Sequence, residues 1–206
     1  MQKKGILTVV SGFSGAGKGT LMKNLMAKHG DNYALSISAT TRGPRPGEEH
    51  GREYFFISKE EFEKMIANDE LIEYAKYVDN YYGTPKNYVE TKLDEGKDVI
   101  LEIEVQGALQ IKEKHPETLL LFVTTKDADV LKNRLVNRGS ETMEVIESRM
   151  SRAGEEAAIM DKYDYLVVND DLDICTEQMH NIIQSAHFKC SLNGAFIDEI
   201  KKELNR

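Results

Sequence analysis

Short apolar runs alternate along this chain with stretches of helical periodicity. The runs are nearly continuous and rich in Val, Ile and Leu, which is typical of strands covered on both faces of a parallel sheet. They lie at residues 6–10, 34–38, 98–105, 118–124 and 165–168. Helical patterns lie between them, at residues 20–29, 106–115, 126–137 and 142–160, and a further helix is expected after Asp171, running toward Cys190. This alternation predicts an α/β doubly wound fold, with a parallel sheet core and helices on both faces.

The segment from about residue 38 to residue 90 interrupts the alternation. Residues 53–57 and 71–78 are rich in Tyr and Phe, and they predict half-exposed antiparallel strands. Between them, Ser58 and Glu61 have the spacing of a capping box that opens a helix over residues 59–68. We therefore expect a small α+β insertion in the parallel core. The charged residues 191–206 predict a solvated helix.

A glycine-rich segment, SGFSGAGKGT, joins the first apolar run to the first helical pattern. Its Gly12, Gly17 and Lys18 have the Gly-x4-Gly-Lys spacing of a phosphate-binding loop, or P-loop. Backbone N–H groups and the helix dipole converge in such a turn, so we expect nucleotide phosphates to bind there. The Ser or Thr usual after the lysine is replaced by Gly19, and Thr20 follows it. A glycine-rich turn with an incidental lysine is the alternative.

A second cluster that suits an anion lies downstream of this loop. Arg42 and Arg45 are three residues apart and are held by prolines and glycines, so their guanidinium groups can grip one phosphate. Tyr54 and the residues NYYGT at 80–84, expected as a tight turn, add hydroxyl groups. A proline-stiffened loop with solvated arginines is the alternative explanation.

Length and composition narrow the class of protein. A chain of 206 residues suits one sizeable core with small inserted parts. Its net charge of −8 argues against a general nucleic-acid or membrane-surface binder. Cys175 and Cys190 lack a CxxC partner or nearby histidines, which favours two reduced thiols in a cytoplasmic protein. No apolar run approaches the ~18 residues of a membrane span.

Taken together, the motifs resemble the guanylate kinase family of P-loop NTPases, over residues 4 to 188. The resemblance rests on the phosphate-binding loop and on motifs that occur in the family's order: Ser38-x-x-Thr41-Arg42-x-Pro44-Arg45-x-Gly47-Glu48, Gly51-x-x-Tyr54-x-Phe56, Ile72-Glu73, the NYYG segment at 80–83, Gln106-Gly107, Arg138-Gly139 and Val168-Asn169-Asp170. It implies transfer of the γ-phosphoryl group of ATP to GMP. It also implies one domain over residues 1–206. In that domain, a core (about 1–37, 91–125 and 161–190) carries a GMP-binding insertion (38–90), a lid (126–160) and a helical tail (191–206).

The resemblance also assigns residues to each substrate. On the ATP side it implies Gly12, Phe13, Ser14, Gly15, Ala16, Gly17, Lys18, Gly19, Thr20, Arg134, Arg138, Asn169 and Asp170. On the GMP side it implies Ser38, Arg42, Arg45, Glu48, Tyr54, Glu73, Tyr82, Gly83, Thr84 and Glu104. The expected catalytic residues are Lys18, Arg42, Arg138 and Arg149.

Chemical reasoning supports several of these assignments. A carboxylate such as Glu73 suits the N1–H and N2 amino donors of guanine, and the hydroxyls of Ser38 and Thr84 suit O6. The acceptor is already an anionic oxygen, so alignment and charge neutralisation suffice for catalysis. Core, insertion and lid should close on both nucleotides to keep water out.

Magnesium is the expected cofactor, bound with ATP. Thr20 and Glu102 are its candidate ligands, directly or through water. Glu102 and Glu104 are two residues apart on a predicted strand and so should share a face, with Glu102 toward the metal and Glu104 toward GMP.

Three other functions stay open at this point: a kinase for another nucleoside monophosphate, a catalytically silent protein-binding module of the same fold, and a simple P-loop NTPase. ATP and GMP are the expected partners, with dGMP as a further acceptor and no nucleic acid or membrane. The oligomeric state is open between monomer and homodimer.

Overall fold

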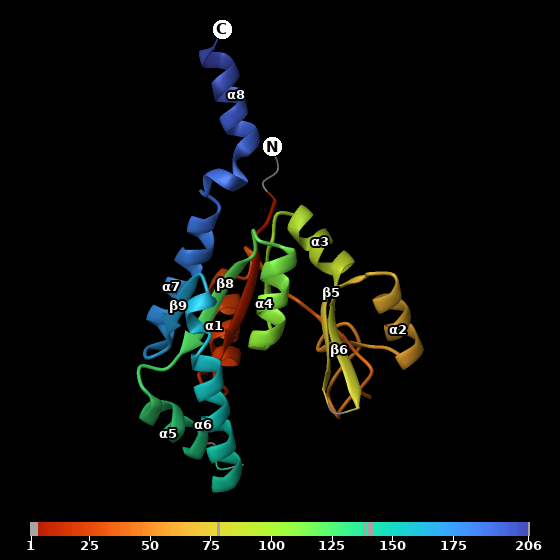
Figure 1. The fold of residues 1–206 in the computed structure, drawn as a ribbon, viewed down its shortest axis with the longest axis vertical. Helices are drawn as coiled ribbons and strands as arrows, with labels where there is room; N and C mark the ends of the chain where they lie inside the picture. Colours follow the sequence, from red (N-terminus) through yellow and green to blue (C-terminus); the bar gives the residue numbers. More distant parts are fainter. Residues whose placement is uncertain (1–3, 78, 138, 140–141, 206) are drawn as a thin grey trace.

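A parallel sheet forms the centre of the protein in the computed structural model, which describes residues 4–77, 79–137, 139 and 142–205 (Figure 1). Among these residues, five strands pair in the order β2-β7-β1-β8-β9, each parallel to its neighbours. They are β1 (Leu7–Gly12), β2 (Tyr33–Leu35), β7 (Asp98–Glu102), β8 (Leu119–Thr124) and β9 (Tyr165–Val168). Every residue of β8 is buried. The apolar runs are therefore confirmed as strands of a parallel core.

Helices cover both faces of this sheet. The helix α4 (Val105–Lys114) lies on the face seen in Figure 1, whereas α1 (Lys18–His29) lies on the opposite face and packs on α7 (Leu172–Ala186). The helices α5 (Ala128–Asn137) and α6 (Met143–Ala157) contact each other and extend beyond the sheet at the end where β1 and β8 finish. The α/β class predicted from the alternation is thus confirmed.

Residues 38–85 form a second lobe beside the core, on the right in Figure 1. Its sheet has the order β4-β3-β6-β5 among the described residues. The strands are β3 (Ser38–Thr40), β4 (Tyr54–Phe56), β5 (Leu71–Tyr77) and β6 (Asn80–Pro85), and the helix is α2 (Lys59–Ala67). The capping box is confirmed, because the Glu61 backbone N–H donates to Ser58 and the Ser58 N–H donates to Glu61. Phe62 of α2 is fully buried and stacks on Tyr81 of β6, which anchors the helix to the sheet.

Three expectations about this lobe are wrong. Residues 34–38 do not form one strand, because the chain leaves the core sheet after Leu35 and enters the second sheet at Ser38. Residues 53–57 are not antiparallel, since β4 pairs with β3 in parallel register, Ser38 opposite Tyr54. The segment at 80–84 is not a tight turn but part of β6, which pairs with both β3 and β5.

The connection after β7 also differs from the prediction. The strand ends at Glu102 instead of residue 105, and Glu104 is already the N-cap of α4. Glu102 and Glu104 therefore do not share a strand face, because a two-residue period holds only in extended chain. The helix predicted over residues 142–160 ends at Ala157 and is followed by the short 3₁₀ turn η1 (Met160–Lys162). The sequence patterns also missed α3 (Lys86–Asp94), which directly follows β6.

The chain ends in α8 (Gly194–Leu204), which follows the short 3₁₀ turn η2 (Cys190–Leu192) and stands away from the body (Figure 1). This confirms the predicted solvated helix. Of the helices in the described ranges, none combines the length and apolar character needed to cross a membrane.

A polar network joins α1, α7 and the first residues of β7. Buried Asp98 accepts hydrogen bonds from the Ile6 backbone N–H and the Gln184 amide, and it pairs with His187 at 2.8 Å. The Tyr33 hydroxyl contacts His180 Nδ1 at 2.8 Å, and the His180 ring stacks on His29 with 3.8 Å between the ring centroids. Burial and the neighbouring His29 lower the pKa of His180, against the opposing charges of Glu177 and Asp98.

The lowered pKa of His180 predicts a pH-dependent stability. The unfolded chain takes up a proton at the ordinary histidine pKa of about 6.5, before the folded chain does, so stability falls as the pH drops below that value. We expect His180→Asn to lose less stability than the wild type between pH 7.5 and pH 5.5 (about one pH unit either side of that pKa), measured as urea midpoints. The control His50→Asn, in the second lobe, should keep the wild-type slope. Identical slopes for wild type and His180→Asn would contradict the assignment.

Candidate active site

The glycine loop between β1 and α1 is a tight turn that only glycine permits at three positions. Gly12, Gly15 and Gly17 have φ values of 148°, 97° and 91°. A Cβ atom at Gly12 would lie 2.0 Å from the Val123 carbonyl oxygen of β8. One at Gly17 would lie 2.5 Å from the Asn169 side-chain nitrogen. Glycine is therefore needed here both for backbone conformation and for close packing against neighbouring elements.

Two side chains from distant elements hold this loop in place. The Ala16 carbonyl accepts hydrogen bonds from the Asn169 amide at 2.8 Å and from Arg134 of α5 at 3.2 Å. Arg134 also donates to the Asn169 carbonyl at 2.8 Å. The structure thus brings Arg134 and Asn169, two of the residues expected on the ATP side, to the loop, where they support its backbone. Asp170, which follows them, pairs with Lys126 at 3.5 Å on the surface.

Lys18 lies over the loop at the start of α1. Its ammonium group donates to the carbonyl oxygens of Gly12 at 2.6 Å and Phe13 at 3.3 Å. The N-terminus of α1 lies in the same place, and an added Cβ at Gly19 would meet nothing within 4 Å. A fixed positive charge, a helix N-terminus and open space together make an anion site of the P-loop kind.

A cleft of about 600 Å³ opens beside the loop, between the end of β7 and α6. Arg149 of α6 donates a hydrogen bond to the Ser14 hydroxyl of the loop. Glu102 also lines the cleft. Its side chain keeps access to solvent, yet the surrounding protein desolvates it and raises its pKa, against the opposing charge of Lys18. Arg138, the other expected lid arginine, lies outside the described residues.

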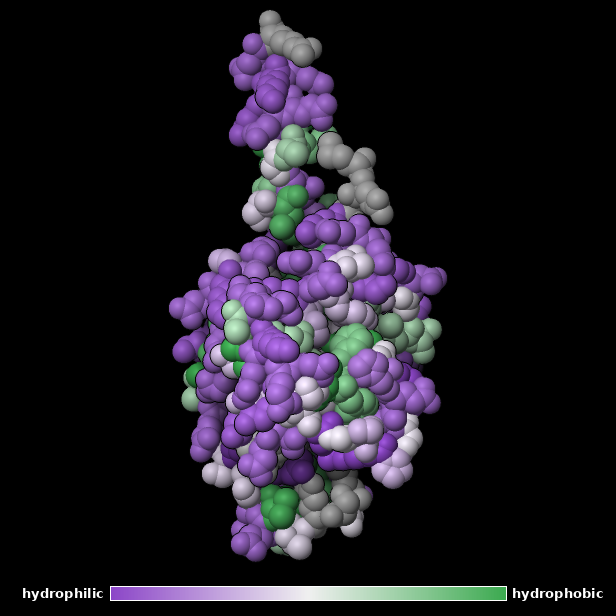
Figure 2. Space-filling view, turned by 90° about the vertical axis from the view of Figure 1, so that its right-hand side faces the viewer, coloured by the Kyte–Doolittle hydropathy of each residue, from purple (hydrophilic) through white to green (hydrophobic). Residues whose placement is uncertain are grey.

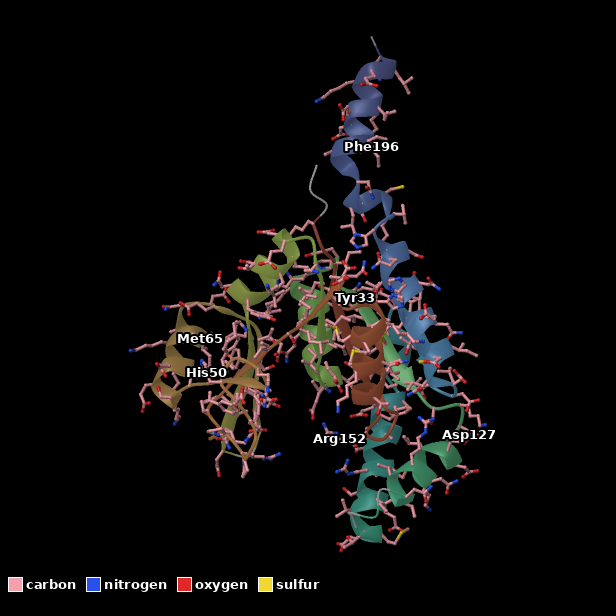
Figure 3. The ribbon with its side chains drawn as sticks, turned by 180° about the vertical axis from the view of Figure 1, so that it is seen from behind. Tyr33, His50, Met65, Asp127, Arg152 and Phe196 are labelled. Atoms are coloured by element: carbon pink, nitrogen blue, oxygen red, sulfur yellow. The ribbon has the colours of Figure 1, made fainter. Side chains whose placement is uncertain are left out.

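An ion pair crosses this cleft at Glu104, the residue expected on the GMP side. Arg152 of α6 pairs with Glu104 at 2.8 Å and with Glu156 of the same helix at 3.3 Å. Figure 3 shows Arg152 on the side of α6 that faces the second lobe. Arg152 was not among the site residues predicted from the sequence. Its signal was the spacing, three residues after Arg149 and four before Glu156, which puts all three on one helix face.

The second anion cluster forms around Arg42, in the loop after β3. The Arg42 guanidinium pairs with Glu48 at 3.0 Å and lies over the rings of Tyr54 at 5.4 Å and Phe56 at 5.8 Å. Tyr82 of β6 packs edge-on against Tyr54. A hydrogen bond from the Arg45 backbone N–H, together with the Arg42 guanidinium, holds the pKa of Glu48 below its usual range. Glu48 thus orients Arg42 and orders the loop.

Glu73 of β5 is a half-buried carboxylate of the second lobe. It accepts a hydrogen bond from the Thr84 hydroxyl at 2.7 Å, and its burial raises its pKa against the effect of that bond. Thr84 itself is fully buried. Its hydroxyl donates to Glu73, so the two form one unit. Gly83 is a packing residue, because a Cβ there would lie 2.8 Å from the Glu73 carbonyl oxygen.

The first turn of α4 connects the two clusters. A Cβ at Gly107 would lie 3.6 Å from the Glu73 carboxylate, so this carboxylate packs against the first turn of α4. Glu104, the N-cap of the same helix, lines the cleft beside the P-loop. The Ser11 hydroxyl of β1 donates to the Ile103 carbonyl at 2.8 Å, which fixes the start of α4 to the loop strand. The two polar sites therefore share one rigid support.

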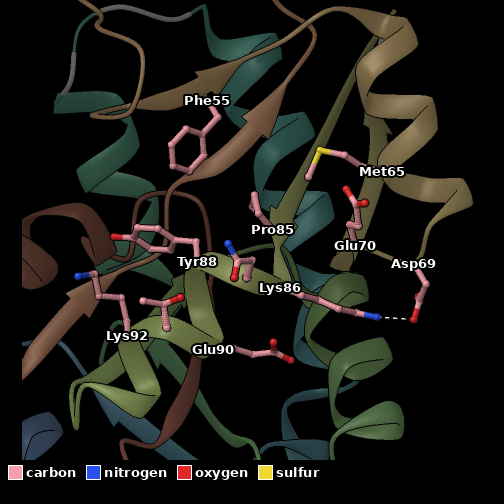
Figure 4. Close-up of a pocket in the computed structure, with 11 residues that line it drawn as sticks. Phe55, Met65, Asp69, Glu70, Pro85, Lys86, Tyr88, Glu90 and Lys92 are labelled. Atoms are coloured by element: carbon pink, nitrogen blue, oxygen red, sulfur yellow. Dashed lines mark hydrogen bonds and ion pairs between the residues drawn. The ribbon is translucent and has the colours of Figure 1, made fainter.

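Another hollow lies between the second lobe and α3, lined by Phe55, Met65, Tyr88 and neighbouring residues (Figure 4). An ion pair between Lys86 and Asp69 lies at its edge. Neither the P-loop nor Arg42, Glu73 or Thr84 lines it. This hollow therefore shares no lining residue with the P-loop or with the side chains of the second lobe that the motifs indicate.

Oxygen donors are the available metal ligands in the cleft. Thr20 is exposed in the first turn of α1, and Glu102 lies close enough to Lys18 to feel its charge. Within the described ranges, no three His, Cys, Asp or Glu side chains gather to hold a metal ion by themselves. Such a donor set fits a hard cation that takes most of its ligands from phosphate and water, as Mg²⁺ does.

Comparisons with known proteins agree with this geometry. The family model described as guanylate kinase matches residues 4–186. Guanylate kinases from Oceanobacillus iheyensis and Lactococcus lactis subsp. lactis are 51% and 50% identical to the chain over 189 residues, which is 92% of this chain and 91% and 92% of theirs. The crystal structure of guanylate kinase from Anaplasma phagocytophilum superposes with a TM-score of 0.70 at 28% identity, over 92% of this chain and 89% of that one. The chain therefore belongs to the guanylate kinase family, and it is an enzyme, a kinase.

Proposed function

We propose that the enzyme transfers the γ-phosphoryl group of ATP to GMP with the P-loop cleft as donor site and the second lobe as acceptor site. Phosphorylation of GMP by ATP is the activity that family membership supports. The observation that carries the residue assignment is the shared support at α4. Glu104, the N-cap of α4, lines the P-loop cleft, and the first turn of α4 lies against the half-buried Glu73 carboxylate. A single short helix start thus fixes the distance between the two substrates.

On the donor side, the loop amides from Gly12 to Thr20 and the α1 N-terminus hold the β- and γ-phosphates, with Lys18 as the mobile charge. Lys18 donates to the loop carbonyls of Gly12 and Phe13, so it is held beside the loop and within reach of the phosphates. Arg134 and Asn169 act through the Ala16 carbonyl. The turn of the loop is completed by Phe13, Gly15 and Gly19. Asp170 lies on the side of the adenine base.

On the acceptor side, Arg42 and Arg45 hold the GMP phosphate together with the hydroxyls of Tyr54 and Tyr82. Glu48 keeps Arg42 in position through their 3.0 Å ion pair. Glu73 accepts the guanine N1–H and N2 protons, while Thr84 and Ser38 supply hydroxyl groups beside it. A partner with two donors compensates the half-buried carboxylate for its lost hydration, whereas adenine lacks this N1–H and N2 donor pair and leaves Glu73 with the hydrogen bond from Thr84.

Charge neutralisation supplies the catalysis. The attacking group is a phosphate oxygen of GMP, so no side chain has to act as nucleophile or base. Lys18, Arg42, Arg149 and Arg138 offset the negative charge shared by donor and acceptor. Arg149 reaches the loop from α6 through Ser14, which makes α6 the element that covers the transferring group and excludes water. Bound Mg²⁺ would supply further charge at the phosphates, held by Thr20 and Glu102.

The substitution Glu73→Gln tests the assignment of Glu73 to the guanine base of GMP. We expect kcat/KM for GMP to fall about 100-fold or more, because an amide offers one acceptor and two unwanted donors to guanine. The KM for ATP should stay within twofold, about the precision of the comparison. The melting temperature should not fall, since the raised pKa shows that the buried charge is unfavourable in the folded chain. Equal losses for GMP and ATP would contradict the assignment.

Gly17→Ala tests the loop geometry. The substitution forces a Cβ into a φ of 91° and to within 2.5 Å of the Asn169 side chain. Displacing the loop by such a contact should lower kcat/KM for ATP by about 100-fold. Gly154→Ala is the matched control, because its Cβ meets nothing within 4 Å and the residue lies in α6 and not in the loop, so it should stay close to wild type. Similar losses in steady-state assays of both variants would argue against the loop geometry.

A further inference from the structure

Arg152 of α6 joins two carboxylates that come from different elements of the site. Its guanidinium donates to Glu104, the N-cap of α4, at 2.8 Å and to Glu156, one turn further along α6, at 3.3 Å. The Glu156 side chain is only 17% exposed and anchors the guanidinium, whereas the side chains of Arg152 and Glu104 are 52% and 69% exposed. We call Glu104, Arg152 and Glu156 the α6 bridge.

The α6 bridge lies between two clefts. All three side chains line the P-loop cleft of about 600 Å³, and all three also line a neighbouring cleft of about 510 Å³ between α6 and the start of α4. Desolvation in this position raises the pKa of Glu156, against the opposing charges of Arg152 and Lys18. The bridge is therefore part of the wall of the candidate active site, although Arg152 and Glu156 have no part in the transfer proposed above.

Stability alone does not account for this contact. Hydrophilic side chains cover most of the face shown in Figure 2, and ion pairs between such exposed groups usually contribute little to folding. The pair of Arg152 with Glu104, in contrast, joins two helices from positions 48 residues apart in the chain. Arg149, three residues earlier on α6, donates to Ser14 of the P-loop. One face of α6 thus contacts the donor loop through Arg149 and the start of α4 through Arg152.

The Glu104 carboxylate does not take the usual place of an acidic group at a helix start. The first N–H groups of a helix and the positive end of its dipole attract such a carboxylate. Within the described residues, however, the Glu104 side chain makes no capping hydrogen bond to α4 and is turned to Arg152 instead. The full charge of Arg152 therefore competes with the helix N-terminus for this carboxylate and holds it in the cleft.

We propose that Arg152 is a positioning residue, which holds Glu104 where its carboxylate accepts a hydrogen bond from the guanine of bound GMP. This inference rests on the proposed function, because it requires guanine at Glu73. Glu104 lies three residues before Gly107, whose added Cβ would be 3.6 Å from the Glu73 carboxylate, so both carboxylates border one side of the first turn of α4. Guanine carries one hydrogen on N1 and two on N2, and Glu73 matches only two of them. Glu104 supplies the acceptor for the third.

Steady-state kinetics of Arg152→Met tests this role, because methionine keeps an unbranched side chain but removes its charge. The KM for GMP should rise about tenfold, since a hydrogen bond to a charged group is lost, while kcat and the KM for ATP stay within about twofold. The melting temperature should shift by less than about 4 °C, as for an exposed ion pair. The matched control Lys28→Met removes an equal charge between Asp173 and Glu177, away from both clefts, and should keep wild-type kinetics.

A double-mutant cycle measures whether Arg152 acts through Glu104. Glu104→Ala alone should raise the KM for GMP about tenfold, and it should leave α4 folded because Glu104 makes no capping bond among the described residues. Adding Arg152→Met to it should change this KM by less than about twofold, because the group that Arg152 holds is already absent. Arg152→Lys retains the charge and should keep the KM for GMP within about threefold of wild type.

Losses that multiply in the double variant would overturn the inference, since Arg152 would then act on a nucleotide independently of Glu104. A KM for GMP equal to wild type in Arg152→Met would overturn it as well. A fall in kcat or a higher KM for ATP in that variant, without a change for GMP, would assign Arg152 to the donor phosphates. All these outcomes leave the proposed function intact, whereas a wild type that forms no GDP from ATP and GMP would overturn that function and this inference with it.

Discussion

The parallel pairing of β1 with β7 on one side and β8 on the other is the constraint on which the site depends. Parallel strands bring their carboxyl ends to one edge, and here that edge carries the P-loop after β1, Glu102 at the end of β7 and the start of α4. Gly12 can approach the Val123 carbonyl of β8 only because it has no side chain. The phosphate site is therefore a consequence of strand order, and its charge comes from Lys18 and the α1 dipole.

The second lobe depends on a different balance. Glu73 is half-buried beside Thr84, and its raised pKa reflects the free-energy penalty of partly removing a carboxylate from water. Such a carboxylate lacks part of its hydrogen bonding until a ligand supplies donors. The free-energy penalty of its burial therefore favours a base that presents N–H groups to it. Arg42 shows the opposite case. Its charge is already balanced by Glu48, so a phosphate ligand has to share a guanidinium that is held in place.

Much of the core could be predicted from the sequence because strands that are buried on both faces, such as β8, are apolar at nearly every position. The runs around β1, β7, β8 and β9 were located correctly, although the edge strand β9 is exposed at three of its four residues, and the capping box at Ser58 marked α2. The errors occur where local pattern does not determine pairing. The separation of β2 from β3 takes place within a few residues and is decided by which sheet offers free backbone partners. The parallel alignment of β4 with β3 is a tertiary choice that a three-residue strand cannot reveal.

The residues of the candidate site likewise divide into those that a local sequence pattern reveals and those that only the fold brings together. Gly12, Gly17, Lys18, Arg42 and Glu73 were found because their chemistry is encoded in spacing. The roles of Asn169 and Arg134 as supports of the Ala16 carbonyl depend on elements far apart in the chain, joined by the fold. Arg152 was missed since a helical arginine flanked by glutamates resembles an ordinary solvated face. Its partner Glu104 was placed on a strand, and it became an N-cap because the chain turns into α4 one residue later.

The central claim is that one short helix start holds a phosphate donor site and a guanine-selective acceptor site at a fixed separation. The most direct measurement is the rate of ADP formation from ATP with GMP, AMP, UMP or dTMP as acceptor under the same conditions. The account predicts that GMP is preferred by about 10⁴-fold in kcat/KM, since the other bases lack the adjacent N1–H and N2 amino donors that match the two oxygens of Glu73. Comparable rates with AMP, or ADP formation that does not depend on any acceptor, would contradict it.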